Sequence, residues 1–207
     1  VEIGTRQYQH PLRDKSTFGR DIDDYPIALI TTALAAMSLD SSIGRNIPNS
    51  DHLLISPRLA VAGEDATLKQ IEELFAECGD VRHYRIAKLL HSPVPALPQL
   101  KNLLEAKPNE EPSTAIPTLE YYNGYWGFAV KGRFVIPPLY DLAFEFSEGL
   151  ALVKIDYVWH FIDTTGRVVI NCGRGVGIKP FKNGVTRIER VDGVYEIKRD
   201  GETKKIE

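Results

Sequence analysis

The chain has 207 residues, which is enough for one large domain or two small ones. Its composition of 43% hydrophobic and 26% charged residues is ordinary for a soluble globular protein. The net charge of −3 is too small to indicate nucleic acid or an acidic membrane surface as a partner.

The cysteine content bears on the compartment of the protein, and the longest apolar stretch bears on membrane insertion. Cys78 and Cys172 are the only cysteines, and they provide neither a disulfide framework nor a paired metal-binding motif, which favours a reducing, cytoplasmic compartment. The longest apolar stretch, residues 27–39, is shorter than the roughly 20 residues of a membrane-spanning helix, so we expect a buried core helix and no membrane span. The chain begins at Val1 without an initiator methionine, and a targeting segment upstream is left open.

Residues 1–106 are predicted to form a mostly helical region. After an irregular, polar start, Pro26 suits the first turn of an apolar helix, where its missing N–H is not needed. Asp24 or Tyr25 is the expected cap of this helix. Residues 41–57 are rich in Ser, Gly, Asn and Pro, and they are predicted to form a loop with one short apolar piece.

Three further helices are expected in this region. Asp65 has the position of an N-cap, apolar residues follow it at helical spacing, and Gly79 stands where a left-handed C-cap belongs. Asp80 is expected to cap the next helix, which runs through Leu90, and Pro98 to open a last helix through residue 106.

The residue composition and the hydrophobic pattern of the sequence change after this helical region. Residues 107–117 contain three prolines and no hydrophobic period, which is typical of a linker. Residues 118–207 consist of short runs rich in Tyr, Phe, Val and Ile, interrupted by glycine, which predicts β-strands. The predicted fold class is therefore α+β, with a helical amino-terminal region followed by an antiparallel all-β unit.

Internal repetition is the clearest signal in the second half. Trp126, Trp159 and Tyr195 fall in register at intervals of 33 and 36 residues, and an apolar residue follows each of them two positions later. Side chains two apart in a strand point to one face, so these positions are predicted to line a common buried core. The repeat core comprises Trp126, Phe128, Trp159, Phe161, Tyr195 and Ile197.

Each repeat is predicted to contain about three strands. Gly132, Gly166 and Gly201 supply the positive φ of a tight hairpin turn, and a return strand follows each turn. Another turn, at residues 147–149, leads into a third strand at residues 150–155. One such unit cannot bury its apolar face alone, so about nine strands are expected to stack as three repeats.

The first repeat resembles the WG (Trp-Gly) repeat family. The resemblance lies in Trp126-Gly127-Phe128, in residues 135–141 (VIPPLYD) and in residues 146–151 (FSEGLA), and it extends over about residues 121–201 only. The second repeat departs from the pattern, because His160 replaces the glycine and the Pro-Pro-x-Tyr-Asp step is missing. The resemblance implies β structure and a binding or scaffolding part, and it brings no catalytic motif.

The segment that most resembles an anion-binding loop of an enzyme is a glycine-rich stretch with basic residues. Its glycine backbone could cradle an anion, so it is kept as an anion-site candidate formed by Gly173, Arg174, Gly175, Gly177 and Lys179. The string is not a complete phosphate-binding loop, and Pro180 follows it closely where a helix would be needed. A degenerate connecting loop is the preferred explanation, because the string stands where the second repeat has lost its Pro-Pro-x-Tyr-Asp step.

The other candidates for chemistry have plainer explanations. His160 falls on the strand face opposite the aromatic residues and is expected at the surface, and the histidines show no metal-ligand spacing. The acidic run of residues 21–24 is expected to cap a helix rather than to bind a metal. Cys172 is expected to be a buried thiol. The tryptophans are expected in the core, since stacking on a ligand requires a tryptophan at the end of the stack.

The expected function is that of a non-catalytic binding module that recognises another protein through the β repeats, with no cofactor. Two alternatives stay open. The repeats could be accessory to a helical enzyme or nucleotide-sensing domain, which would require a deep pocket with convergent polar groups and perturbed pKa values. The chain could also be the neutralising partner of a toxin.

Overall fold

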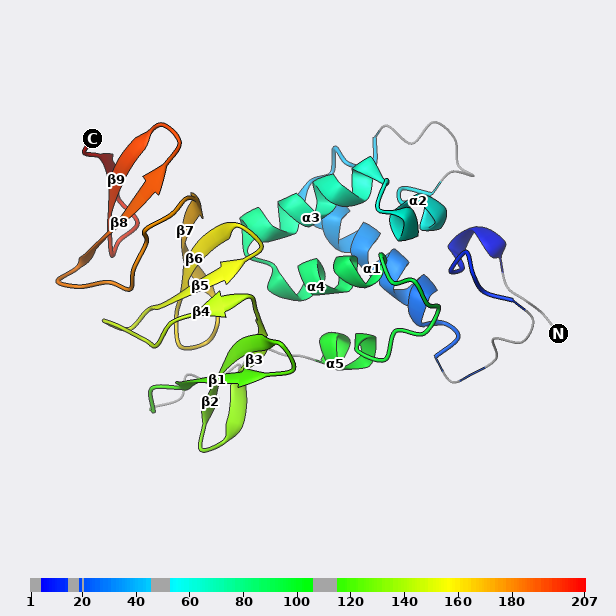
Figure 1. The fold of residues 1–207 in the computed structure, drawn as a ribbon, viewed down its shortest axis with the longest axis horizontal. Coiled ribbons are helices and arrows are strands. Elements are labelled where there is room, and N and C mark those ends of the chain that lie inside the picture. Colours follow the sequence, from blue (N-terminus) through cyan, green and yellow to red (C-terminus); the bar gives the residue numbers. More distant parts are fainter. Residues whose placement is uncertain (1–4, 15–18, 20, 46–52, 106–114) are drawn as a thin grey trace. The chain divides into compact units, whose positions relative to one another are not determined.

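The computed structural model describes residues 5–14, 19, 21–45, 53–105 and 115–207 and is drawn in Figure 1. Helices form the amino-terminal half and three antiparallel sheets the carboxy-terminal half, which confirms the α+β class. The chain divides into two compact units. The helical unit comprises residues 1–75 and 82–105, and the β unit comprises residues 76–81 and 106–207. Most of the predicted linker, residues 107–114, lies outside the described residues.

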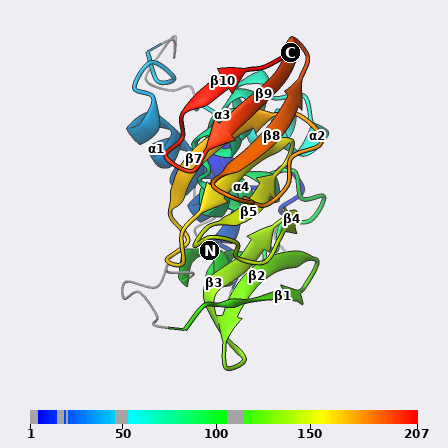
Figure 2. The same ribbon diagram turned by 90° about the vertical axis from the view of Figure 1, so that its left-hand side faces the viewer.

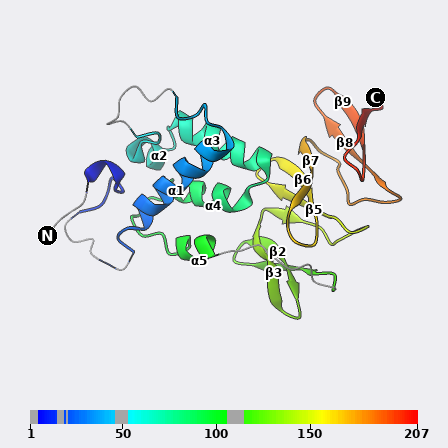
Figure 3. The same ribbon diagram turned by 180° about the vertical axis from the view of Figure 1, so that it is seen from behind.

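The helical unit is built from short elements (Figure 3). They are the 3₁₀ turn η1 (Arg6–Tyr8) and the helices α1 (Asp24–Leu39), α2 (Pro57–Ala62), α3 (Ala66–Cys78), α4 (Val81–Leu89) and α5 (Leu100–Glu105). The last residues of α3 and the first of α4 belong to the β unit. None of the described helices is both long and apolar enough to span a membrane.

The helices differ from the predicted ones in three places. Helix α5 begins at Leu100 rather than at Pro98. Helix α1 has Asp23 at its N-cap, so Pro26 occupies the third helical position rather than the first. The amide N–H groups of the whole first turn have no partner within the helix, so proline fits at any of these positions. Helix α2 was not predicted, although Ser56 accepts a hydrogen bond from the Leu59 N–H and Gly63 ends the helix in a left-handed conformation.

Polar side chains fix the loops of the helical unit to its core. Asp65 caps α3 as predicted, because its Oδ1 accepts from the Leu68 N–H at 2.8 Å. Its Oδ2 accepts from the Ser56 N–H, also at 2.8 Å, and thereby holds the start of α2. The buried Tyr25 donates its hydroxyl to the Leu90 carbonyl at 3.2 Å. One carboxylate therefore serves two helix starts, and the fold of this unit depends on it.

The β unit contains three antiparallel sheets with orders β1-β2-β3, β4-β5-β6-β7 and β8-β9-β10 (Figure 2). The strands are β1 (Thr118–Tyr122), β2 (Tyr125–Val130), β3 (Arg133–Tyr140), β4 (Leu142–Ala143), β5 (Ala151–Ile155), β6 (Val158–Ile162), β7 (Val168–Arg174), β8 (Val185–Arg190), β9 (Gly193–Lys198) and β10 (Thr203–Lys205).

The sheets group the strands differently from the sequence repeat. The strand that closes the first sequence repeat, β5, pairs with β6, which carries the tryptophan of the second repeat. In the same way β8 pairs with β9 of the third repeat. Strand β1, which was not predicted, supplies the corresponding partner of β2. Each sequence repeat thus begins in one sheet and ends in the next.

Aromatic contacts join consecutive sheets. Phe128 of β2 packs against Phe146, with ring centroids 4.9 Å apart, and Phe161 of β6 packs against Phe181 at 4.3 Å. Phe146 and Phe181 each precede a turn whose two central residues have positive φ, Glu148-Gly149 in the first case and Asn183-Gly184 in the second. This type of tight turn matches the twist of the strands on either side. The repeated Phe-x-x-Gly step of the sequence is therefore the joint between sheets.

Candidate functional site

An aromatic pair lies on the first two strands of the β unit. Tyr121 of β1 is directly opposite Trp126 of β2, and their ring centroids are 4.9 Å apart. Tyr121 is 60% exposed and Trp126 is half-buried. Residues opposite one another in antiparallel strands share a face. The two rings therefore form one partly exposed aromatic surface, called here the Tyr121–Trp126 pair.

The equivalent tryptophan of the second repeat has a different environment. Trp159 is 9% exposed, and its Nε1 donates a hydrogen bond to the Gly175 carbonyl at 3.1 Å. Phe144 packs against its indole with centroids 6.3 Å apart. Trp126 belongs to the first of the three sheets. It therefore has the position at the end of the stack that a ligand-stacking role requires.

The opposite face of the same sheet carries a second aromatic pair. Tyr122 follows Tyr121 in β1 and points to the other face, as successive strand residues do. Its ring lies 6.1 Å from that of Phe134, and the residue is 55% exposed. Two neighbouring tyrosines of similar exposure thus lie on the two faces of one sheet.

The predicted repeat core is buried in the middle of the array and partly open at its ends. Phe128, Phe161 and Ile197 are fully buried, and Trp159 is nearly so. Trp126 in the first sheet and Tyr195 in the last are only half-buried. The reason is that a terminal sheet has a neighbouring sheet on one side only.

Close backbone packing requires the glycine of the WG pattern. A Cβ atom on Gly127 would lie 2.6 Å from the Pro138 nitrogen and 2.7 Å from the Ile136 carbonyl oxygen. These are backbone atoms and cannot move aside easily. The Pro-Pro step of the first repeat therefore covers Gly127, and the two parts of the motif depend on each other.

The prediction that His160 is a surface side chain was wrong. His160 is fully buried, and its Nε2 donates a hydrogen bond to the Ala76 carbonyl at 2.7 Å. Its Nδ1 has no hydrogen-bond partner among the described residues. Burial lowers the pKa of His160 below its ordinary value of 6.5, so the ring is neutral at pH 7. In the second repeat a helix end thus covers the position that Pro138 covers in the first.

Residues 76–81, which belong to the β unit, are held by β6 and β7. Besides the bond from His160, the Nδ2 of Asn171 donates to the Glu77 carbonyl at 2.6 Å. A Cβ on Gly79 would lie 2.4 Å from a side-chain carbon of Val168, so the glycine is needed for this approach. These side-chain contacts add to the local capping of the carboxy end of α3, where the Gly79 N–H also donates to the Ala76 carbonyl at 3.2 Å. The contacts of residues 76–81 with His160, Asn171 and Val168 are called here the clasp. The replacement of the WG glycine by His160 was the sequence signal for it.

The anion-site candidate has a structural role at its centre. Gly175 passes under β8, where a Cβ would lie 2.6 Å from both the Glu189 carbonyl oxygen and an Ile188 side-chain carbon. Val176 and Glu189 exchange two backbone hydrogen bonds of 2.9 Å. Two glycines of the candidate, Gly173 and Gly177, have positive φ. The segment is thus the connection between the second and third sheets.

Part of the anion-binding capacity of this segment is already used. The Gly173 N–H donates to the Asn171 Oδ1 at 2.8 Å, and the Val176 N–H is engaged with Glu189. The Arg174 and Lys179 side chains are exposed, and the Lys179 carbonyl accepts from the Thr186 hydroxyl at 2.7 Å. A cradle needs several convergent free amides, so the geometry favours the connecting-loop interpretation.

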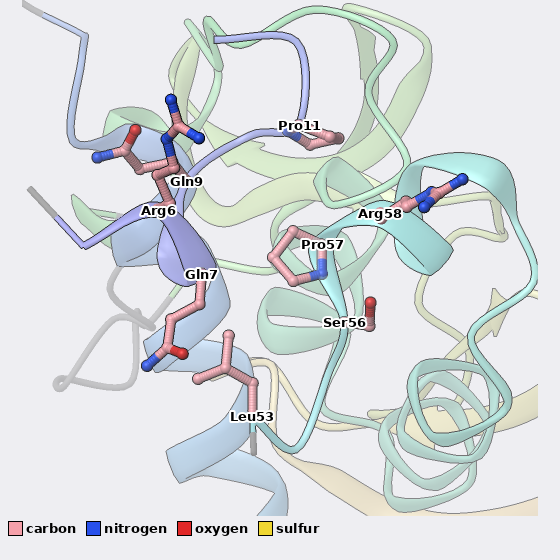
Figure 4. Close-up of a pocket in the computed structure, with 8 residues that line it drawn as sticks. All are labelled: Arg6, Gln7, Gln9, Pro11, Leu53, Ser56, Pro57 and Arg58. Carbon is pink, nitrogen blue, oxygen red and sulfur yellow. The ribbon is translucent and has the colours of Figure 1, made fainter. Parts of the chain in front are cut away.

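A cavity of about 380 Å³ opens in the helical unit, between the amino-terminal segment and the start of α2 (Figure 4). It is lined by Arg6, Gln7, Gln9, Pro11, Leu53, Ser56, Pro57 and Arg58. Figure 4 shows the two guanidinium groups on opposite sides of the cavity, and both arginines are exposed. This arrangement does not concentrate positive charge at one point.

Both ring nitrogens of His91, in the helical unit, lie within hydrogen-bond distance of an acceptor. Its Nε2 lies 2.6 Å from the Glu72 Oε1 and its Nδ1 lies 2.8 Å from the Ala60 carbonyl oxygen. Both partners are acceptors, so this arrangement favours the protonated ring, in which both nitrogens donate. The hydrogen bond to Glu72 raises the pKa of His91. Among the described residues, no three His, Cys, Asp or Glu side chains are placed to hold a metal ion.

Comparison with known families places the sequence repeat on this structure. The family model of the WG containing repeat matches residues 130–159, which confirms the resemblance for that segment. The segment runs from the end of β2 to Trp159 on β6, and so spans parts of two sheets. No characterised protein and no solved structure gives a significant match.

Proposed function

We propose that the β unit is a non-catalytic module that recognises another protein, and that its contact surface is centred on the Tyr121–Trp126 pair. The observation that supports this most is the contrast between two equivalent tryptophans. Trp159 is enclosed and hydrogen-bonded, whereas Trp126 is half-buried beside an exposed tyrosine. Exposed neighbouring aromatic side chains are enriched at the centres of protein interfaces.

The pair is held in a fixed position. The backbone pairing of β1 with β2 and of β2 with β3 sets the position of both rings. Tyr140, the register partner of Trp126 on β3, is buried. A rigid surface loses little conformational entropy when a partner binds. Its rings offer apolar contact area, and the tyrosine hydroxyl and the indole N–H offer polar contacts at their edges.

The proposal is tested by comparing two neighbouring tyrosines. The full chain is immobilised, exposed to an extract of the native host, and the captured proteins are identified and quantified by mass spectrometry. Tyr121→Ala should reduce capture of the specific partner by about tenfold or more, since interface aromatic residues often contribute over 1.4 kcal/mol. Tyr122→Ala, the same change on the opposite face, is the matched control and should leave capture nearly unchanged.

Each variant is also examined by thermal denaturation, so that lost capture is not mistaken for unfolding. Equal loss in both tyrosine variants with unchanged melting curves would mean that the contact surface lies elsewhere on the sheet. Capture that survives Tyr121→Ala at full strength would refute the role of the pair.

A further inference from the structure

Helix α1 is apolar on both of its faces. Tyr25, Ala28 and Leu29 belong to the face that is buried in the helical unit. On another face Ile27, Ile30 and Leu34 are 41%, 46% and 59% exposed, respectively. Their spacing of three and four residues places them in one stripe along the helix, called here the outer stripe.

Surface helices normally carry charged residues on the outward face. Residues 25–39 of α1 contain no Asp, Glu, Lys or Arg. The outer stripe is therefore apolar and lies on a helix face without charged residues, as is typical of a contact surface for another molecule.

One end of the outer stripe is acidic. Asp21 and Asp23 are exposed just before α1, and neither side chain makes an ion pair or hydrogen bond within the described part of the chain. The pKa of Asp24 is raised by its partial burial and by the charges of Asp21 and Asp23, so the three carboxylates repel one another. The helix dipole favours negative charge at this end, but it does not account for the apolar stripe beside it.

We propose that the outer stripe binds an amphipathic helix of a partner protein. The partner helix presents apolar side chains at i, i+3 and i+7 to Ile27, Ile30 and Leu34, which is a common form of helix recognition. Basic residues at one end of that helix meet Asp21 and Asp23. The charge fixes the direction of the partner helix, and the stripe supplies the apolar contact.

Charge complementarity selects this occupant over two others. In a parallel pair of two copies, the aspartates of one copy would face those of the other. In an antiparallel pair they would face the carboxy end of α1, where Asp40 and the negative end of the helix dipole lie. A membrane surface attracts basic rather than acidic flanks.

The test uses a fluorescently labelled 18-residue peptide of leucine and lysine, with leucines spaced to form one helical stripe, and the full chain. We expect the peptide to bind in an anisotropy titration, and a version with glutamate in place of lysine to bind at least about tenfold more weakly. Leu34→Ser should weaken binding by a similar factor. Leu12→Ser, at a position that is 64% exposed outside the stripe, is the matched control and should not.

A second variant tests the charge. Asp21→Asn combined with Asp23→Asn should weaken binding of the leucine–lysine peptide and reduce its dependence on salt, while asparagine keeps the capacity to cap α1. Both sets of variants should melt at the parent temperature, because the side chains changed are exposed. If Leu34→Ser lowers the melting temperature, Ile30→Ser takes its place.

Three results would overturn the proposal. They are equal binding of the lysine and glutamate peptides, unchanged binding by the stripe variants, and a dimer in sedimentation that Leu34→Ser dissociates. Tyr121→Ala should leave peptide binding unaffected, so failure of the proposed function and failure of this site are distinguishable.

Discussion

The half-buried His91 and the buried His160 contribute to stability with opposite dependence on pH. Both ring nitrogens of His91 face acceptors, and its pKa is raised above 6.5 mainly by the hydrogen bond to Glu72. His160 donates only from Nε2, and burial lowers its pKa below 6.5. A raised pKa gives stability that is complete below the unfolded value and is lost as the pH rises through the folded value. A lowered histidine pKa gives the reverse.

For His160 we predict a loss of stability in mild acid. Its contribution is complete above about pH 6.5 and decreases as the pH falls through the range between its unfolded and folded pKa values. Both tryptophans lie in the β unit, so tryptophan fluorescence in urea titrations reports that unit alone. The urea midpoint should fall between pH 7.5 and 5.5 in the parent and fall less in His160→Gln, which keeps a donor for the Ala76 carbonyl.

His91→Gln is the control, because it lies in the helical unit and should leave the pH dependence of the fluorescence transition unchanged. A midpoint that falls equally in parent and His160→Gln would assign the acid sensitivity to other groups.

The two tryptophans should differ in their contribution to stability. Replacing the enclosed Trp159 with alanine should cost about 3–5 kcal/mol of unfolding free energy, the usual range for a large buried aromatic. Trp126→Ala should cost less, because part of the Trp126 surface remains in water and that part contributes no transfer free energy. Chemical denaturation followed by far-ultraviolet circular dichroism measures both. Equal costs would mean that Trp126 is covered in solution.

Among the elements, those with a local signal were predictable. The strands follow from residues alternating at period two and from turn glycines, and α3 follows from Asp65, its apolar period and Gly79. Helix α2 was missed because six residues are too few to show a period. The sequence did not show which strands share a sheet, because the pairing of β5 with β6 depends on the turn at Asp156 rather than on the repeat.

The candidate site was predicted in part. The requirement for a tryptophan at the end of the stack follows from the sequence, but the presence of Tyr121 opposite Trp126 depends on β1, whose pairing the sequence did not reveal. The clasp at His160 was missed because its partner, the Ala76 carbonyl, is 84 residues away along the chain. The replacement of the WG glycine by His160 was visible in the sequence, but it could not identify the partner, because a backbone carbonyl carries no residue identity.

At the level of the β2–β3 hairpin, we predict that Gly127→Ala is strongly destabilising. The added Cβ would meet the backbone of Ile136 and Pro138 at less than 3 Å, so the strands must separate. Overpacking of this kind costs about 1–3 kcal/mol or more. Gly132→Ala is the control for loss of glycine alone, since it has space for a Cβ but has positive φ. A midpoint for Gly127→Ala above that of Gly132→Ala would contradict the close approach.

For the molecule as a whole, the β unit includes six residues from the helix–helix junction. A fragment of residues 118–207 lacks the carbonyls that His160 and Asn171 bind and exposes the surface of Val168 that Gly79 covers. We predict that this fragment folds with a lower urea midpoint than the β unit has in the full chain. Because His160 is then hydrated, the fragment should also lose most of the acid dependence described above.

Adding a peptide of residues 66–81 in excess provides the control, because it should raise the midpoint of the fragment by binding the folded form. A fragment as stable as the full chain would show that the clasp contributes little.

The offset between sequence repeat and sheet has a consequence for how such an array can lengthen. One whole period of the repeat, such as residues 127–159, begins in one sheet and ends in the next, so a tandem duplication of it brings the end of one sheet and the beginning of another. The strands at the two ends of the inserted copy pair with strands of the neighbouring repeats. No strand beside the insertion is therefore left without its pairing partner. Growth in the interior of the array therefore keeps every hydrogen-bonding partner, whereas truncation within it leaves a sheet without a strand. Selection can add or remove whole periods in the middle while the first sheet, with its exposed aromatic pair, stays as it is.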